Sequence, residues 1–336
     1  MKTFQFIATL VLAVSFFTIQ AQTKSNYKIA NKIHLEGDEK WDYLYSDDDA
    51  GMLYISHGSI VQIVDEAKGQ VVGKITGLIG VHGIAIAPAL NKGFISNGKD
   101  NSVTIFDTKT LQVITNIKVG SNPDAILFDP FSKKVFTFNG KSNNSTVINT
   151  ETNQIETTIA LAGKPEFAVS DKKGKVYVNF EEESKVCQIN TEKLKVENVW
   201  PLAPGEGPTG LALDNKNHRL FSVCGNKLMI VMDALTGKVI TSLTIGDKAD
   251  GVAFDPELQC AYSSNGEGTM TVVKGDGDDK FSVAENFTTQ KGAKTIAVNR
   301  KTHHLYLSSA NFEAAKPGEK GKIIPDSFVI LDIAPL

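Results

Sequence analysis

Six ionisable side chains that could bind a ligand recur along the chain at nearly constant spacing. They are Asp42, His82, Asp124, Glu166, Asp250 and Lys294. Thr209 stands between Glu166 and Asp250, and with it each member follows the previous one by 40 to 44 residues. Carboxylate oxygens and an imidazole nitrogen suit Ca²⁺, Mn²⁺ or Zn²⁺, or a ligand rich in hydroxyl groups. We therefore predict that the histidine and the four carboxylates form a candidate site for a divalent metal.

A second polar set recurs with the same period, at the end of the expected second strand of each repeat. Its members are His57, Asn97, Asn139 and Asn265, with Phe180, Cys224 and Ser309 at the equivalent positions of other repeats. We predict that this set lies behind the first and contributes to ligand binding. The alternative is a structural role for both sets, because Asp and Asn side chains near turns commonly bond to their own loop backbone. A repeat also places similar residues in rings whether or not a ligand exists.

The elements that must position these residues are short strands separated by turns. One repeat shows all four, with strand-like alternation at 252–254, 261–263, 270–272 and 281–283. A turn residue follows the third strand in each unit, and five examples are Asp65, Asp107, Asn149, Asn190 and Asp233. Four strands in a repeat of about 40 residues are typical of a propeller blade. Seven such units predict an all-β fold, a seven-bladed β-propeller that spans residues 22–336 as a single domain.

The two ends of the repeat array indicate how the ring closes. The last unit has three strand-like segments, at 295–298, 304–307 and 328–333, and then the chain ends. Residues 27–35 resemble an isolated outer strand that precedes the first unit. We predict that this N-terminal strand completes the last blade and removes an exposed sheet edge.

The last unit also carries an insertion, residues 309–326, where other units have only a few residues. Long loops on a rigid scaffold often carry function. We expect this loop at the channel mouth. Lys320 would place positive charge there, beside the four carboxylates of the candidate site, and contact the ligand. The alternative is a solvated loop without a ligand.

The stretch 94–107 reads Phe-Ile-Ser-Asn-Gly-Lys-Asp-Asn-Ser-Val-Thr-Ile-Phe-Asp, and Thr110 and the run 120–123 (Gly-Ser-Asn-Pro) follow it. This pattern resembles the YVTN family of β-propeller repeats, which occur in bacterial periplasmic and archaeal surface-layer proteins. The resemblance covers nearly the whole chain after residue 21 and implies the propeller fold. It implies little about activity, because one fold hosts many functions.

The first 21 residues are predicted to be a secretory signal peptide. Lys2 precedes an apolar run from Phe6 to Phe17, and Ala21 offers a small residue at a cleavage point. The run is shorter than the roughly 20 apolar residues that a membrane-spanning helix needs. An N-terminal helix of the folded domain is the alternative interpretation. We therefore expect a periplasmic or secreted protein that is not inserted in a membrane once the signal is removed.

Charge and motifs narrow the expected function. The net charge is −3 and both signs are interspersed, which argues against a nucleic-acid partner. The sequence contains no G-x-S-x-G, H-E-x-x-H, phosphate-loop or C-x-x-C-H motif. We therefore expect a propeller that binds a small molecule, a glycan or a protein at the channel mouth without evident catalysis. The alternative is a metal-assisted hydrolase or lyase, similar to a lactonase, that uses the acidic ring.

Overall fold

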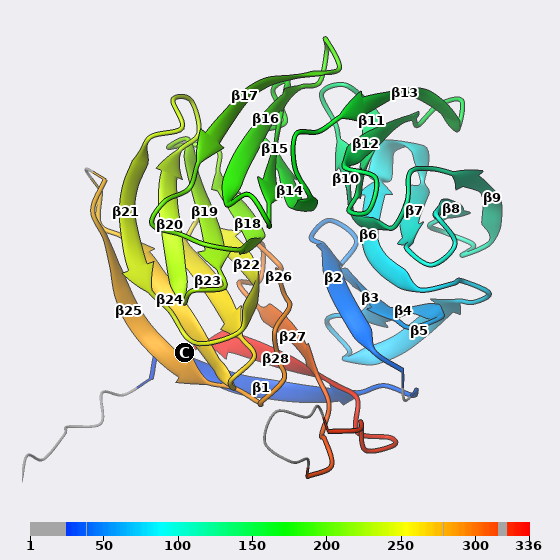
Figure 1. Cartoon of the computed structure of the whole chain (residues 1–336). Coiled ribbons are helices and arrows are strands. Elements are labelled where there is room, and N and C mark those ends of the chain that lie inside the picture. The colour runs from blue at the N-terminus through cyan, green and yellow to red at the C-terminus, as the bar shows by residue number, and fades with distance from the viewer. Residues whose placement is uncertain (1–24, 38, 278, 315–320) are drawn as a thin grey trace, which may run out of the picture.

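The computed structural model describes residues 25–37, 39–277, 279–314 and 321–336. The predicted signal peptide and Lys320 lie outside these ranges. Within them, 28 strands form seven sheets of four strands each, and neighbouring strands pair antiparallel. Figure 1 shows the sheets arranged around a central axis, each with one strand next to the axis. The predicted all-β, seven-bladed propeller is confirmed.

The blades follow one another in chain order, and within the first six blades the strands also run outward from the axis in chain order. Blade 1 is β2 (Trp41–Asp47), β3 (Met52–His57), β4 (Ile60–Asp65) and β5 (Gln70–Ile75). Blade 2 is β6 (Val81–Ala87), β7 (Lys92–Asn97), β8 (Ser102–Asp107) and β9 (Val113–Lys118), with the short 3-10 helix η1 (Pro88–Leu90) between its first two strands. Blade 3 is β10 (Pro123–Asp129), β11 (Lys134–Asn139), β12 (Asn144–Asn149) and β13 (Gln154–Ala160). Blade 4 is β14 (Pro165–Ser170), β15 (Lys175–Phe180), β16 (Lys185–Asn190) and β17 (Lys195–Pro201).

The remaining three blades repeat this arrangement, and the last one uses both ends of the described chain. Blade 5 is β18 (Pro208–Asp214), β19 (Arg219–Cys224), β20 (Leu228–Asp233) and β21 (Val239–Thr244). Blade 6 is β22 (Ala249–Asp255), β23 (Cys260–Asn265), β24 (Thr269–Gly275) and β25 (Phe281–Thr288). Blade 7 is β26 (Ile296–Val298), β27 (Leu305–Ser309), β28 (Val329–Pro335) and β1 (Tyr27–His34).

The ring closes through the N-terminal strand, as predicted. β1 pairs antiparallel with β28, with Tyr27 opposite Pro335 and His34 opposite Val329. Figure 1 shows β1 along the outer side of the last blade. The Tyr27 hydroxyl also lies 3.2 Å from the hydroxyl of Tyr262, which ties this strand to blade 6.

The hydrophobic core lies between neighbouring blades. Phe136 and Phe138 of blade 3 are fully buried and pack in one cluster with Val176 and Val178 of blade 4. Burying each such side chain stabilises the fold by about 1.5–3 kcal/mol. Outer strands alternate instead, and Val113 of β9 leaves 45% of its surface exposed. The middle strands are therefore buried on both faces, because each blade is covered by the next.

Polar residues at the ends of the third strands act as the predicted turn residues. Asp107 Oδ1 accepts hydrogen bonds from the backbone N–H of Lys109 (2.9 Å) and Thr110 (2.8 Å). Asp233 Oδ1 accepts from Leu235 and Thr236 in the same way. These carboxylates therefore build turns and are not available as a second acidic ligand ring.

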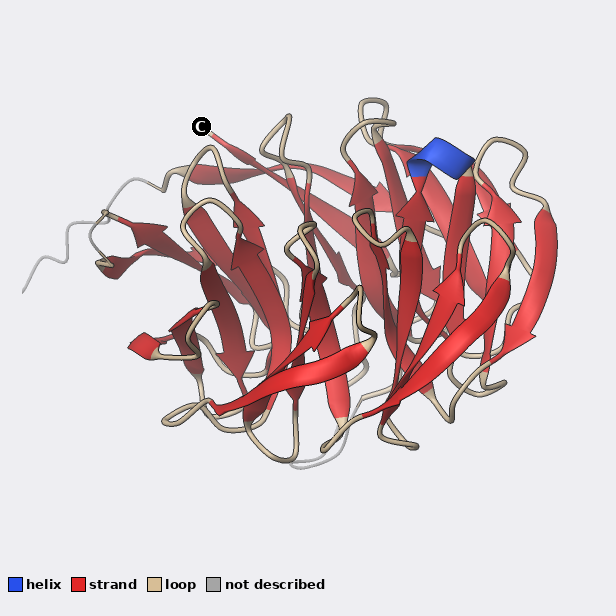
Figure 2. Ribbon diagram, turned by 90° about the horizontal axis from the view of Figure 1, so that it is seen from above, coloured by secondary structure: helices blue, strands red, loops and turns tan. Residues whose placement is uncertain are grey.

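The strands run between two faces of the ring, and the connecting loops lie on those faces (Figure 2). One face carries the loops that enter the innermost strands and those that join the second and third strands of each blade. The insertion between β27 and β28 belongs to this face, where an isolated bridge joins Phe312 to Ile323. Its Phe312 ring lies 6.0 Å from the ring of Trp41, at the start of β2. Among the described residues, no helix is long and apolar enough to cross a membrane.

Candidate functional site

The members of the first polar set occupy the same place in their blades. Six of the seven positions are the second residue of an innermost strand, and Lys294 lies two residues before β26. The six are Asp42, His82, Asp124, Glu166, Thr209 and Asp250. We call the seven residues the inner ring.

A break in strand pairing accompanies the inner ring in these six strands. The ladder between β2 and β3 shifts register between Trp41 and Leu44, and the ladder between β10 and β11 shifts between Pro123 and Ile126. The other four innermost strands shift at the equivalent point. Such a bulge bends the strand and re-aims a side chain. The repeated irregularity thus turns the inner ring toward the channel.

Hydrogen bonds from the preceding blade fix the backbone of several inner-ring residues. The Ser96 hydroxyl of blade 2 donates to the carbonyl of Asp124 at 2.5 Å. The Thr295 hydroxyl of blade 7 donates to the carbonyl of Asp42 at 2.8 Å. Because the backbone is held in this way, the side chains enter the channel from fixed positions.

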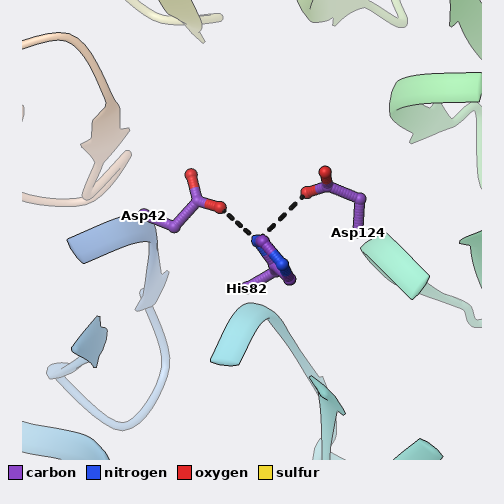
Figure 3. A group of neighbouring side chains, drawn as sticks. All are labelled: Asp42, His82 and Asp124. Carbon is purple, nitrogen blue, oxygen red and sulfur yellow. Dashed lines mark hydrogen bonds and ion pairs between the residues drawn. The ribbon is translucent and has the colours of Figure 1, made fainter. Parts of the chain in front are cut away.

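Three inner-ring side chains from consecutive blades converge on one point, which we call the Asp42–His82–Asp124 cluster. His82 Nδ1 lies 2.6 Å from Asp42 Oδ2 and 3.6 Å from Asp124 Oδ1, as Figure 3 shows. One ligand atom from each residue lies within 4.8 Å of the other two. The side chains are 20%, 27% and 19% exposed for Asp42, His82 and Asp124, so the cluster is screened but reachable from solvent.

Two glycines give this cluster its space. A Cβ atom at Gly98 would lie 2.5 Å from His82 Nε2, so a side chain there would displace the imidazole. A Cβ atom at Gly83 would lie 3.2 Å from the carbonyl oxygen of Asp124. The lack of side chains at both positions lets β10 approach β6 closely and brings Asp124 beside His82.

Burial and crowding of like charges dominate the electrostatics of the inner ring. Burial raises the pKa of Asp124 to about 7, and the charge of Asp42 adds to this rise. Burial also raises the pKa of Glu166 to about 9, with a further contribution from Asp124. For His82, burial lowers the pKa, but the hydrogen bond to Asp42 and the nearby Asp124 outweigh it and the net shift is upward. Protons are therefore held at this site near neutral pH.

The other inner-ring residues have different partners. Lys294 forms an ion pair with Asp250, and the Thr209 hydroxyl donates to the carbonyl of Ala249 at 3.1 Å. The carboxyl group of Glu166 forms no hydrogen bond or ion pair with any described side chain. Glu166 and Asp250, which we predicted as metal ligands, therefore lie outside the group that converges on His82.

An aromatic contact lies immediately next to the inner ring. The rings of Tyr43 and Phe167, which follow Asp42 and Glu166 in the chain, lie 5.2 Å apart although they come from blades 1 and 4. Two blades on opposite sides of the axis thus meet through these side chains. The inner ring therefore lies next to an aromatic contact that crosses the axis. Our sequence reasoning missed Tyr43 and Phe167, although an aromatic directly after an acidic inner-ring residue was a visible signal.

The second polar set lies inside the blades and does not face the channel. His57, Asn97, Asn139 and Asn265 are each at most 2% exposed. Asn139 Nδ2 donates to Asn144 Oδ1 (2.7 Å) and Thr146 Oγ1 (3.0 Å), and Asn265 Nδ2 donates to Thr269 and Thr271 of its own blade. These side chains bond the second strand to the third, and their role in ligand binding stays a prediction.

The described part of the insertion contributes an aromatic contact. Trp41 packs between Phe312 of the insertion and Phe328, with its ring 5.1 Å from the Phe328 ring. The described part of the loop therefore packs on an aromatic residue next to Asp42. Lys320, the predicted cationic contact, lies outside the described residues.

Comparison with known proteins supports the fold. No family model matches the sequence, and no curated protein matches it. Among solved structures, the chain is similar to one titled Kuenenia stuttgartiensis hydrazine synthase, with a TM-score of 0.69 and 17% sequence identity. The likeness covers 87% of this chain and 95% of that chain. At this identity it shows the fold alone, so membership of the YVTN family stays a prediction, and the chain is a seven-bladed β-propeller.

Proposed function

We propose that this chain is an exported β-propeller that binds a ligand at the inner ring of its channel mouth. The ligand is a small molecule, a glycan or a protein group that presents several hydroxyl groups or a cation. The inner ring supports this, because four of its seven side chains are carboxyl groups against one lysine and one histidine.

One observation carries the proposal. Asp124 Oδ1 is buried and has no hydrogen-bond partner among the described residues, although the Asp124 carboxyl group also interacts with the Tyr43 hydroxyl. Leaving a buried acceptor without a partner costs about 1–3 kcal/mol, and such atoms are rare in folded proteins. A bound ligand would supply the missing partner.

Export is part of the proposal and rests on the sequence of residues 1–21. A periplasmic or secreted location follows from a positive start, a short apolar run and a small-residue exit. Fractionation of cells that express the full chain, compared with a chain lacking residues 2–21, tests this directly. Retention of both forms in the cytoplasm would contradict it.

A second candidate function is metal-assisted hydrolysis or elimination, and the Asp42–His82–Asp124 cluster favours it. A divalent ion held there would polarise a carbonyl group or lower the pKa of a bound water molecule. Hydrolysis of a set of sugar lactones, measured with added Mn²⁺ or Zn²⁺ and with EDTA, separates this function from binding alone.

Thermal melting in EDTA with a panel of sugars, sugar acids and amino sugars tests the binding function. We expect at least one compound to raise the melting midpoint, since a ligand at 100 times its dissociation constant adds about 2.7 kcal/mol. The rise should be lost in Glu166→Gln and kept in Glu192→Gln, which changes an exposed glutamate outside the ring. A rise that survives Glu166→Gln, or no rise with any compound, would argue against a ligand site at this ring.

A further inference from the structure

We propose that the Asp42–His82–Asp124 cluster is a binding site for one divalent metal ion of the Mn²⁺ and Zn²⁺ class. This inference rests on the proposed function, because it names the first component that the channel mouth binds. Five metal ligands were predicted from the sequence, and three of them form this cluster. The other two, Glu166 and Asp250, lie outside it.

The geometry of the cluster suits a metal ion better than a pair of hydrogen bonds. His82 Nδ1 faces two carboxylate oxygens, at 2.6 Å on Asp42 and 3.6 Å on Asp124. A single Nδ1 proton can be donated along only one of these directions, and Asp42 is the closer acceptor. A metal ion bound by Nδ1 in place of that proton would contact all three ligand atoms, since each lies within 4.8 Å of the others.

The missing hydrogen bond at Asp124 is a second, independent observation. Among the residues that the structure describes, its buried Oδ1 atom has no hydrogen-bond partner, and it is directed at the imidazole across 3.6 Å (Figure 3). A cation at the centre of the cluster would satisfy this oxygen and would also reduce the repulsion between the two carboxylates.

The scaffold holds the ligands before any ion arrives. Ser96 bonds the carbonyl of Asp124 and, at 2.8 Å, accepts the N–H of Gly83, so one hydroxyl fixes the strands that carry His82 and Asp124. The space beside Gly98 sets the place of the imidazole. A site built on fixed strands holds its ligands more accurately than one on loops.

The ligand set determines the class of ion. One imidazole nitrogen and two carboxylate oxygens suit Mn²⁺ or Zn²⁺, whereas Ca²⁺ prefers about six to eight oxygen ligands. Three protein ligands leave coordination positions open. Asp250 is engaged by Lys294, so it does not fill them. Oxygen atoms of a second ligand would bind the ion at these positions.

Isothermal titration of the purified, chelator-treated protein with MnCl₂, ZnCl₂ and CaCl₂ tests the inference. We expect about one Mn²⁺ or Zn²⁺ per chain, weaker binding of Ca²⁺, and a loss of affinity of about tenfold or more in His82→Ala and in Asp124→Asn. Asp124→Asn keeps the size of the side chain, so it tests the site even if the truncation His82→Ala disturbs folding.

His303 provides the matched control, because it forms a similar pair with a carboxylate in another part of the propeller. Its Nδ1 lies 2.7 Å from Asp255 Oδ2, and its Nε2 lies 3.6 Å from Glu257. His303→Ala should leave metal affinity unchanged. Equal affinities in the original protein, His82→Ala and Asp124→Asn would overturn the inference, as would a loss confined to His303→Ala.

The outcomes separate this inference from the proposed function. If a compound of the sugar panel raises the melting midpoint in EDTA while no metal binds, the metal site is contradicted and the binding function is supported. If Mn²⁺ or Zn²⁺ binds at this cluster while no compound does, the metal site is supported and the proposed binding of an organic ligand is contradicted.

Discussion

Asp124 and Asn139 belong to the same blade and to two rings that the repeat builds side by side, yet their surroundings differ. Asn139 is fully buried, and its amide donates to Asn144 and Thr146 while its oxygen accepts from Thr137 at 3.0 Å. Asp124 has a buried oxygen, Oδ1, for which the described part of the chain supplies no hydrogen-bond partner. A ring of polar residues therefore follows from repetition alone. At these two positions the number of partners that the protein itself supplies differs, although Asn97 Oδ1 of the second polar set also lacks a hydrogen-bond partner among the described residues.

The histidines extend this comparison. His303 and His304 each bond a carboxylate, Asp255 at 2.7 Å and Asp332 at 2.6 Å. His82 forms a pair of the same length with Asp42. What distinguishes His82 is the second carboxylate on the same nitrogen. A histidine–aspartate pair by itself is therefore common in this fold and marks no site.

The largest effect should come from breaking the structural ring. Asn139→Ala leaves the partners of a fully buried amide without hydrogen bonds, and we expect a loss of about 2–3 kcal/mol in the free energy of unfolding. Urea unfolding measures this loss. Metal affinity should not change in the same variant. Unchanged stability of Asn139→Ala, or weaker metal binding by it, would contradict the different roles given to the inner ring and the second polar set.

A smaller effect should appear in the pH dependence of stability. The pKa of Glu166 is raised by burial from 4.5 to about 9, so the folded state holds this proton more tightly than the unfolded chain does. The stabilisation is complete below the unfolded pKa and is lost as pH rises toward the folded pKa. We therefore expect stability to fall between pH 4.5 and about 9, by roughly 1–3 kcal/mol.

Thermal melting across this pH range, without metal, measures the contribution of Glu166. Glu166→Gln cannot ionise at this position, so its stability should fall less steeply than that of the original protein. Glu192→Gln is the control and should follow the original curve. Parallel curves for Glu166→Gln and the original protein would contradict the predicted electrostatics of the inner ring.

The smallest effect on stability, but a specific one on binding, is expected at Gly98. Gly98→Ala places a Cβ atom 2.5 Å from His82 Nε2 and should turn the imidazole away, which weakens Mn²⁺ or Zn²⁺ binding, by about tenfold. Gly140→Ala is the matched control in the next blade, because its Cβ atom would meet nothing closer than 3.7 Å. Metal titration of the two variants compares them, and equal affinities would show that His82 is not a ligand.

The fold could be predicted from the sequence because each repeat carries its own strand and turn signals. The closure by residues 27–34 could also be predicted, since the last unit lacks one strand. The different surroundings of the inner ring and the second polar set could not be predicted from the sequence. Which carboxylates converge depends on close approaches at Gly83 and Gly98, and the contact between Tyr43 and Phe167 joins blades far apart in the sequence. Such distances come from packing and leave no periodic signal in the sequence.

Anomalous X-ray diffraction from crystals of the protein grown with MnCl₂ tests the central claim most directly. We predict one strong manganese peak between Asp42 Oδ2, His82 Nδ1 and Asp124 Oδ1, and its disappearance in Asp124→Asn. Refined metal–ligand distances should be about 2.0–2.2 Å. A peak beside His303, or an empty cluster in protein saturated with Mn²⁺, would contradict it.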